Sequence, residues 1–398
     1  MTEPEVSTVA GVELAGVAAG LKSSGGLDVA LVRLAADSRT AAVFTRNAFC
    51  AAPVHVAREH LAGGAPRLLL INAGCANAGT GREGEADARA TCAHVAASSG
   101  VEPTQVLPFS TGTIGPRLPV DSLCAGADRA LAALTPDGWH AAATAIMTTD
   151  TRAKVASRRV TLAGGTVTVT GMAKGAGMIR PDMATMLAFV ATDAVVEGAE
   201  LDGLLRRAVA RSFHCITVDG DTSTNDAATL SATGAAGAEP ADDDERERLA
   251  AATDAVFIEL AQAVVADAEG ATRLIEIAVA GGRDVAECRA VGFTVAHSPL
   301  VKTAVFGGDP NWGRILAAVG RAPVADLDVA TIDIGLGDVP LVAGGEPVPG
   351  YEEATAAAAM RADPVRIRID LGRGKATSCV WTSDLSYDYV RINADYRT

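Results

Sequence analysis

Short apolar runs alternate with longer Ala-rich stretches along the whole chain. The four consecutive apolar residues 68–71 predict a buried strand, because a strand covered on both faces needs no polar positions. Residues 160–170 alternate apolar residues with threonines around Gly164 and Gly165, which predicts a β-hairpin. Further strands are predicted at residues 274–279, 301–306, 365–371 and 378–382.

Helical patterns fall between these strands. Residues 84–99 are rich in Ala and stop at Gly100, and residues 201–213 repeat apolar residues at three- and four-residue spacing between arginines. Residues 242–269 open with acidic residues, which are favourable at a helix N-terminus, and continue as a long amphipathic pattern. We therefore predict a layered α/β protein with helices packed on sheets.

Composition narrows the function classes. Of the 398 residues, 49% are hydrophobic and 21% charged, as in a globular protein of one large or two ordinary domains. The 48 acidic residues outnumber the 34 Lys and Arg residues, which gives a formal charge of −14. Nucleic acid is not expected as a partner, because phosphate binding depends on clustered basic residues, and an aromatic content of 4% offers no stacking surface.

Cysteine spacing and the first residues bear on the compartment. The seven cysteines are scattered without a CxxC pair, so neither a disulfide framework nor a metal site is predicted, and free thiols in a reducing compartment are expected. The N-terminal residues carry acids where a signal peptide needs a basic region. No apolar run approaches the roughly 18 residues that span a bilayer. We therefore expect a cytoplasmic protein that does not enter a membrane.

Two familiar kinds of site are not supported. Residues 308–314 are similar to a nucleotide-binding P-loop, but Arg314 and Ile315 stand where that loop needs Lys and a hydroxyl. His55 and His60 are five residues apart and would not share a helix face, so they predict no metal site. The other histidines lie singly and give no anchor for a Ser-His-Asp triad. Nucleophilic catalysis would therefore need a base other than histidine.

Residues 171–190 form a glycine-rich loop that leads into an apolar run. Its glycines predict tight turns after the hairpin, and its Lys174 is one of only five lysines. Thr185 follows the small Ala184 at the start of the run. From these residues alone, the loop is either a plain strand entry or a self-cleavage site, where the Thr185 hydroxyl attacks the Ala184 carbonyl. Cleavage would supply the missing base, because a terminal amine has a pKa of about 7.7–8.0 and activates the hydroxyl.

A set of sequence blocks resembles the ornithine acetyltransferase family, the ArgJ-type glutamate N-acetyltransferases of arginine biosynthesis. The central block, GMAKGAGMIRPDMATMLAF, is similar to the self-processing signature of that family. The others follow in the order of the family from about residue 11 onward. They are residues 110–115 (STGTIG), 147–151 (MTTDT), 217–226 (TVDGDTSTND), 269–272 (EGAT), 302–303 with 307–314 (GGDPNWGR), and the C-terminal 387–398.

The resemblance implies a layered αββα architecture, similar to N-terminal-nucleophile hydrolases but with different connectivity. It implies self-cleavage between Ala184 and Thr185, giving an α chain of residues 1–184 and a β chain of residues 185–398 that form one catalytic unit. It also implies a heterotetramer of two α and two β chains.

The resemblance also implies the roles of individual residues. Thr185 would be the nucleophile, with its own α-amine as general base, and Thr111 and Gly112 would stabilise the oxyanion. The implied substrate-binding residues are Thr148, Lys174, Thr185, Glu269, Asn393 and Thr398. In this set Lys174 suits a carboxylate and Glu269 suits an ammonium group. Whether Thr148 or Thr149 meets the ligand stays open, and we take Thr148.

The implied reaction is ping-pong acetyl transfer from N2-acetyl-L-ornithine to L-glutamate, with no cofactor. The sequence leaves open whether acetyl-CoA also serves as a donor. Residues 72–78 read NAGCANA where relatives usually have NSGNANA, so the substrate preference, primary or secondary-metabolite, is also open. Two alternatives remain: a self-processing amidase or aminopeptidase of similar architecture, in which water accepts the acyl group, and an inactive precursor or binding protein.

Overall fold

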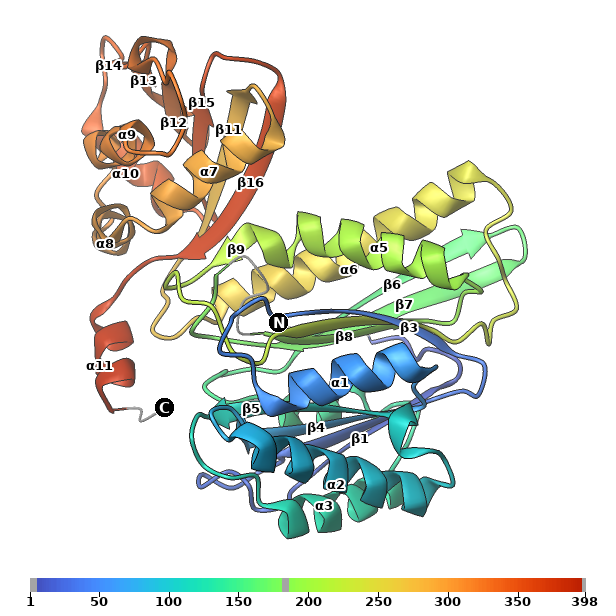
Figure 1. The fold of residues 1–398 in the computed structure, drawn as a ribbon. Helices are drawn as coiled ribbons and strands as arrows, with labels where there is room; N and C mark the ends of the chain where they lie inside the picture. The colour runs from blue at the N-terminus through green and yellow to red at the C-terminus, as the bar shows by residue number, and fades with distance from the viewer. Residues whose placement is uncertain (1–5, 181–185, 396–398) are drawn as a thin grey trace.

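The computed structural model describes residues 6–180 and 186–395, and within them three β-sheets organise the chain (Figure 1). In spatial order, sheet A contains β1 (Val12–Val17), β2 (Val29–Leu34), β4 (Leu68–Cys75) and β5 (Val106–Thr113). Sheet B contains β3 (Arg39–Phe44), β10 (Ala227–Ala232), β8 (Leu187–Thr192), β7 (Gly165–Lys174) and β6 (Lys154–Leu162). Sheet C contains β14 (Glu346–Pro347), β13 (Val339–Ala343), β12 (Asp333–Leu336), β15 (Val365–Asp370), β11 (Leu274–Gly282), β16 (Ala376–Ser383) and β9 (Ile216–Thr217).

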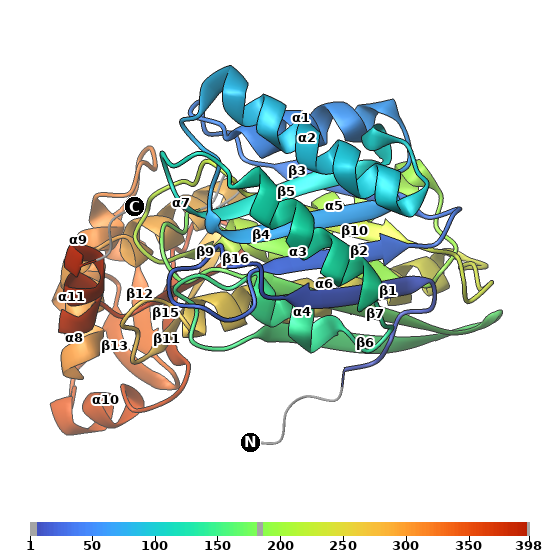
Figure 2. The ribbon, with the colours of Figure 1, turned by 90° about the horizontal axis from the view of Figure 1, so that it is seen from below.

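Sheets A and B lie face to face and form the centre of a four-layer stack (Figures 1 and 2). Their inner faces share one apolar core, in which the rings of Phe109 and Phe189 meet edge to face at 4.9 Å. The outer face of sheet A packs on α2 (Gly81–Ser99) and α3 (Val120–Ala132), and that of sheet B on α5 (Gly198–Arg211) and α6 (Asp243–Ala266). The predicted αββα layering is confirmed.

The remaining helices lie beside this stack or around sheet C. Helix α1 (Ala52–Gly63) packs on β5 and α2. Helix α4 (Trp139–Ala145) contacts both sheets A and B and contributes to the core between them. Sheet C has its own core with α7 (Val285–Ala296), α8 (Pro299–Gly307), α9 (Trp312–Gly320) and α10 (Glu353–Ala359). The 3-10 turns are η1 (Pro103–Gln105), η2 (Phe213–Cys215) and η3 (Val329–Thr331). The last helix, α11 (Tyr387–Asp395), follows an extended segment and stands apart in Figure 1.

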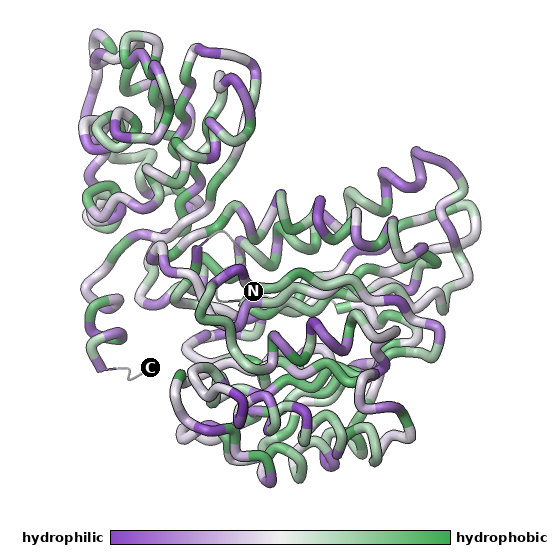
Figure 3. Tube along the Cα trace, viewed as in Figure 1, coloured by the Kyte–Doolittle hydropathy of each residue, from purple (hydrophilic) through white to green (hydrophobic). Residues whose placement is uncertain are grey.

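Hydropathy follows this layering. Apolar positions run along the strands between the layers, while polar positions gather on the outer turns of the helices (Figure 3). The central strand β4 is almost wholly buried, which explains its unbroken apolar run. The helix α2 ends as predicted at Gly100, whose φ of 68° allows the left-handed cap. The helix α6 begins after Asp242, whose carboxylate accepts the Glu245 N–H at 2.9 Å.

One expectation is wrong. Residues 301–306 belong to α8 and not to a strand, because Ser298 caps the helix, Pro299 follows at its first position, and Gly308 ends it with a φ of 71°. The helix α6 is long and apolar enough on average to cross a membrane, although polar and charged residues interrupt its apolar run. More than half of that apolar window is buried inside the protein, however, as in the core helix of a layered fold.

Candidate active site

A pocket opens where the ends of β5 and β7 meet the loops before β10 and β11. The predicted residues Thr111, Gly112, Thr148, Lys174, Glu269 and Asn393 all line it. They come from five separate places in the chain, because Thr111 and Gly112 are neighbours, so their meeting is a product of the fold. The predicted cleavage pair Ala184 and Thr185, and the predicted ligand-binding Thr398, lie outside the described residues. The roles of all these residues stay predictions.

The strand β5 delivers Thr111 and Gly112 at the point where it runs closest to β4. Gly112 has a φ of 131°, and a Cβ there would lie 2.4 Å from the main-chain carbon of Gly74. Only glycine therefore allows this approach of the two strands. Thr111 and Gly112 therefore lie next to each other at the pocket wall, and a hydroxyl together with a backbone N–H is the donor pair that an oxyanion needs.

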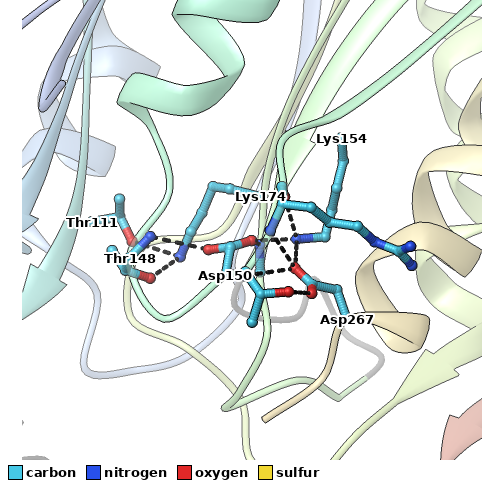
Figure 4. Close-up of polar contacts among 9 residues, drawn as sticks. Thr111, Thr148, Asp150, Lys154, Lys174 and Asp267 are labelled. Carbon is cyan, nitrogen blue, oxygen red and sulfur yellow. Dashed lines mark hydrogen bonds and ion pairs between the residues drawn. The ribbon is translucent and has the colours of Figure 1, made fainter. Parts of the chain in front are cut away.

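Lys174 lies at the end of β7 and is 3% exposed. Its Nζ donates hydrogen bonds to Thr148 Oγ1 at 2.8 Å and to Thr111 Oγ1 at 3.1 Å (Figure 4). An ammonium group only donates, so each hydroxyl must direct its own hydrogen elsewhere and is free to donate to a ligand. Burial lowers the pKa of Lys174, against the attraction of Asp150.

Beneath Lys174 lies a buried ion-pair network, drawn in Figure 4. Lys154 Nζ is 2.6 Å from Asp150 Oδ1 and 2.6 Å from Asp267 Oδ2, and all three side chains are at most 4% exposed. The Asp150 carboxylate also accepts the N–H groups of Gly175 at 2.7 Å and Thr148 at 3.0 Å. The network thus holds the backbone of Thr148 and the peptide that follows Lys174, so these two side chains enter the pocket from fixed positions.

The Asp150 carboxyl makes the folding stability of the protein depend on pH in the acidic range. Burial disfavours its charge, but the charges of Lys174 and Lys154 and the Gly175 N–H outweigh burial and lower its pKa to about 2. Above about pH 5 both the folded and the unfolded carboxyl are ionised, so the stabilisation is complete there; it is lost as pH falls from about 5 toward 2.

We therefore expect the free energy of unfolding to fall by about 2 kcal/mol between pH 5 and pH 2 through this one group. Urea titrations at several pH values measure it, with Asp150→Asn as the comparison. The variant should be less stable at pH 5 but should lack this part of the acid slope. Equal acid slopes in the two proteins would contradict the prediction.

The same pocket also contains an acidic side chain, that of Glu269. Asn393, on α11, donates from Nδ2 to Glu269 Oε2 at 2.9 Å, and the Glu269 N–H donates to the Ala176 carbonyl at 2.9 Å. A Cβ on Gly177 would lie 2.5 Å from Glu269 Oε2, so any larger residue there would require the Glu269 carboxylate to shift. Because Lys174 and Glu269 line the same pocket, it has one cationic and one anionic side chain.

Asp219 holds the loop that follows Lys174. Its carboxylate accepts the N–H groups of Met178 at 2.6 Å and Ile179 at 2.9 Å. Met178 has a φ of 56°, a region that side chains other than glycine adopt only when the surroundings hold them there. Burial raises the pKa of Asp219, while the amides that it accepts lower it.

Sequence reasoning did not assign a role to several residues that the fold brings here. Ser223, Thr224 and Asn225 line the pocket, and Asp150 and Lys154 support it. Ser223, Thr224, Asn225 and Asp150 lie inside the blocks 217–226 and 147–151, so the signal was present as a matching block without a role. Asp267 and Lys154 lie outside every block, and only the three-dimensional contacts reveal them.

Comparison with known proteins connects this pocket to a family. The model of the ArgJ family matches residues 13–398. The chain belongs to the ArgJ family. The arginine biosynthesis bifunctional protein ArgJ of Methylococcus capsulatus is 55% identical over 401 residues, covering 100% of this chain and 98% of that protein. The protein of the same name from Pseudomonas fluorescens is 51% identical over 398 residues, covering 99% of this chain and 98% of that protein.

A solved ArgJ structure supports the assignment. The arginine biosynthesis bifunctional protein ArgJ of Bacillus halodurans has a TM-score of 0.50 and 40% identity, and the match covers 52% of this chain and 98% of that one. The predicted family is therefore confirmed, and this ArgJ-family chain is an acetyltransferase of arginine biosynthesis. The ArgJ assignment does not by itself say which residue of the pocket does what.

Proposed function

We propose that this enzyme moves the acetyl group from N2-acetyl-L-ornithine to L-glutamate through an acetyl ester on Thr185. The observation that carries the proposal is the pocket itself, which is lined by the Thr111 hydroxyl bonded to the buried Lys174, by Gly112 and by the Glu269 carboxylate. An α-amino acid with a cationic side chain has the complementary charges. Lys174 would bind its carboxylate, and Glu269, oriented by Asn393, would bind its ammonium group.

The chemistry balances with the groups of this chain. The Thr185 hydroxyl attacks the acetyl carbonyl of acetyl-ornithine, and its proton passes to the α-amine of the same residue. The developing oxyanion accepts hydrogen bonds from the Thr111 hydroxyl and the Gly112 N–H. The C–N bond then breaks, the α-amine returns the proton to the ornithine nitrogen, and the acetyl group stays on Thr185. The neutral amine of glutamate attacks this ester, and the proton that it loses passes through the α-amine to the leaving Thr185 oxygen. Acetylglutamate then leaves with the Thr185 hydroxyl restored.

The proposal includes how the enzyme is made and where it acts. Cleavage between Ala184 and Thr185 would produce chains 1–184 and 185–398, both of which contribute to the pocket. Thr111, Thr148 and Lys174 belong to the first, Glu269 and Asn393 to the second. Two copies of each chain would form a heterotetramer. The cytoplasm suits the seven cysteines, which are all free. No cofactor is required by these steps, and acetyl-CoA is a second donor to be assayed.

The decisive experiment follows acetyl-ornithine consumption with and without glutamate. Transfer predicts that consumption depends on glutamate and that acetylglutamate appears in equal amount. Consumption that is indifferent to glutamate, with free acetate as product, would instead show an amidase. The same assay with acetyl-CoA in place of acetyl-ornithine decides whether the enzyme acetylates glutamate directly.

A further inference from the structure

Asn225 and Asp226 stand in sequence directly before β10, at the level of the pocket. The side-chain amide of Asn225 donates from Nδ2 to the main-chain carbonyls of Ala76 at 2.7 Å and Ser110 at 3.0 Å. The side chain of Asp226 accepts the Met186 N–H through Oδ1 at 3.0 Å. Neighbouring residues therefore bind two segments that are far apart in sequence.

Each of these segments adjoins one half of the proposed catalytic machinery. Ser110 directly precedes Thr111, one of the proposed oxyanion donors, and Met186 directly follows Thr185, the proposed nucleophile. The two halves belong to different sheets, since β5 is in sheet A and β8 is in sheet B. The shared interface of the sheets is an apolar core, which fixes their separation only loosely because apolar contacts have no direction. Hydrogen bonds do have a preferred direction, so those made by Asn225 and Asp226 can fix the position of one sheet relative to the other at this end.

Sheet topology explains why side chains are needed here. The strand β5 is an edge strand of sheet A, so main-chain groups along its outer side have no ladder partner. Asn225 satisfies the Ser110 carbonyl at that edge. In sheet B, β10 runs parallel to β8 with Ala227 opposite Leu187. The Asp226 carboxyl therefore continues the ladder by one step, in place of a main-chain carbonyl.

The amide of Asn225 has no donor left for a substrate. Both of its N–H groups point to main-chain carbonyls, and its Oδ1 accepts the Thr224 hydroxyl at 2.5 Å. Although Asn225 lines the pocket, its polar atoms are therefore engaged with the protein. This arrangement is that of a positioning residue.

Asp226 is adapted to hold a backbone in a buried place. The residue is 0% exposed, and within residues 6–180 and 186–395 its Oδ2 makes no hydrogen bond. Burial raises its pKa well above the ordinary value, against the opposing effects of the Met186 N–H, the Ser223 hydroxyl and the charge of Lys174.

We infer that Asn225 and Asp226 together set the position of the nucleophile relative to the oxyanion donors. This inference rests on the proposed function, in which Thr185 attacks and Thr111 and Gly112 stabilise the oxyanion. Its physical basis is that a misplacement of about 1 Å between reacting groups can lower the rate about 10²-fold. Loss of either side chain should therefore slow the chemical step and leave substrate binding nearly intact.

The test for Asn225 is a double-mutant cycle on purified, processed enzyme. We expect Asn225→Leu to lower kcat by about 10- to 100-fold, with KM changed by less than about threefold. Thr111→Ala should lower kcat by about 10²–10³-fold. If Asn225 acts through Thr111, the double variant should be only slightly slower than Thr111→Ala, because the second change removes an effect already lost.

Three results would overturn the inference: an unchanged kcat in Asn225→Leu, a purely KM effect, or effects that multiply in the double variant. Full activity in Thr111→Ala would instead refute the oxyanion assignment of the proposed function. The Asn225→Leu variant alone would then test the inference. A lower kcat at unchanged KM would support positioning through Gly112, and an unchanged kcat would overturn the inference.

The test for Asp226 compares Asp226→Val with Asp226→Asn. The asparagine variant keeps an oxygen acceptor for the Met186 N–H and should retain most of kcat, whereas valine should lose at least about tenfold. Equal kcat values in the two variants would overturn the role of Asp226.

A control separates positioning from stability. Thr253 is buried in α6, and its hydroxyl donates to the Leu249 carbonyl at 2.9 Å, away from the pocket. Thr253→Val should lower the melting temperature and leave kcat per folded enzyme unchanged. If Asn225→Leu does not fold, Thr224→Val replaces it in the cycle, because it removes the hydroxyl that orients the amide of Asn225. A kcat for Thr224→Val equal to that of the unaltered enzyme would then overturn the inference.

Discussion

A Thr185→Ala protein should remain one uncut chain and should transfer no acetyl group. The same hydroxyl is proposed to open the Ala184–Thr185 bond and later to carry the acetyl group, so its removal eliminates both reactions at once. Turnover should fall by at least about 10⁴-fold, as expected when a nucleophile is removed and only binding and oxyanion stabilisation remain. A denaturing gel and an intact-mass measurement detect the loss of cleavage, and the acetyl-transfer assay measures the loss of turnover.

Thr185→Ser is the matched control, because it keeps a hydroxyl group on Cβ and the α-amine. It should still yield two fragments and should keep measurable turnover. N-terminal sequencing of the second fragment should begin at residue 185. Two fragments from Thr185→Ala, or a second fragment that begins elsewhere, would require a different nucleophile. A fully active enzyme that stays uncut would show that the terminal amine is not the base.

The layers of the fold were predictable because hydrophobic periodicity is local. Residues 68–71 appear within β4, residues 84–99 within α2, and residues 160–170 across the hairpin of β6 and β7. The strand predicted at 301–306 failed for a physical reason. Its apolar residues fit a short strand or a short buried helix equally well, and the Ser298 cap and Pro299 decide for the helix.

From the sequence, site residues could be predicted only where they lie in a block that resembles the family. The blocks around Thr111, Thr148 and Lys174 indicated residues that do line one pocket. They could not indicate which residues hold these side chains, because the supporting contacts join distant segments. Lys154 and Asp267 are 113 residues apart, and Asn225 and Ser110 are 115 apart. Periodicity and spacing contain no information about such pairs, so their discovery needs the three-dimensional structure.

Lys154→Met should be the most destabilising of the single changes beneath the pocket. Lys154 is 1% exposed and is the shared cation of Asp150 and Asp267, so its loss leaves two buried carboxylates without this partner. Removing one member of a buried ion pair typically costs 3–5 kcal/mol, roughly the size of the whole stability margin of a weakly stable protein. Chemical denaturation at pH 7 measures the loss.

The matched control lies on the same strand. Arg158 also belongs to β6 and pairs with Glu259 on α6 at 2.6 Å, but both side chains are more than 40% exposed. Arg158→Met should cost no more than about 1 kcal/mol, because water already solvates both charges. Lys154→Met should also raise the pKa of Asp150, since the charge of Lys154 is one of the causes that lower it. Equal losses for the two variants would mean that water or a neighbouring group replaces Lys154, and that the network does not hold the pocket as its burial indicates.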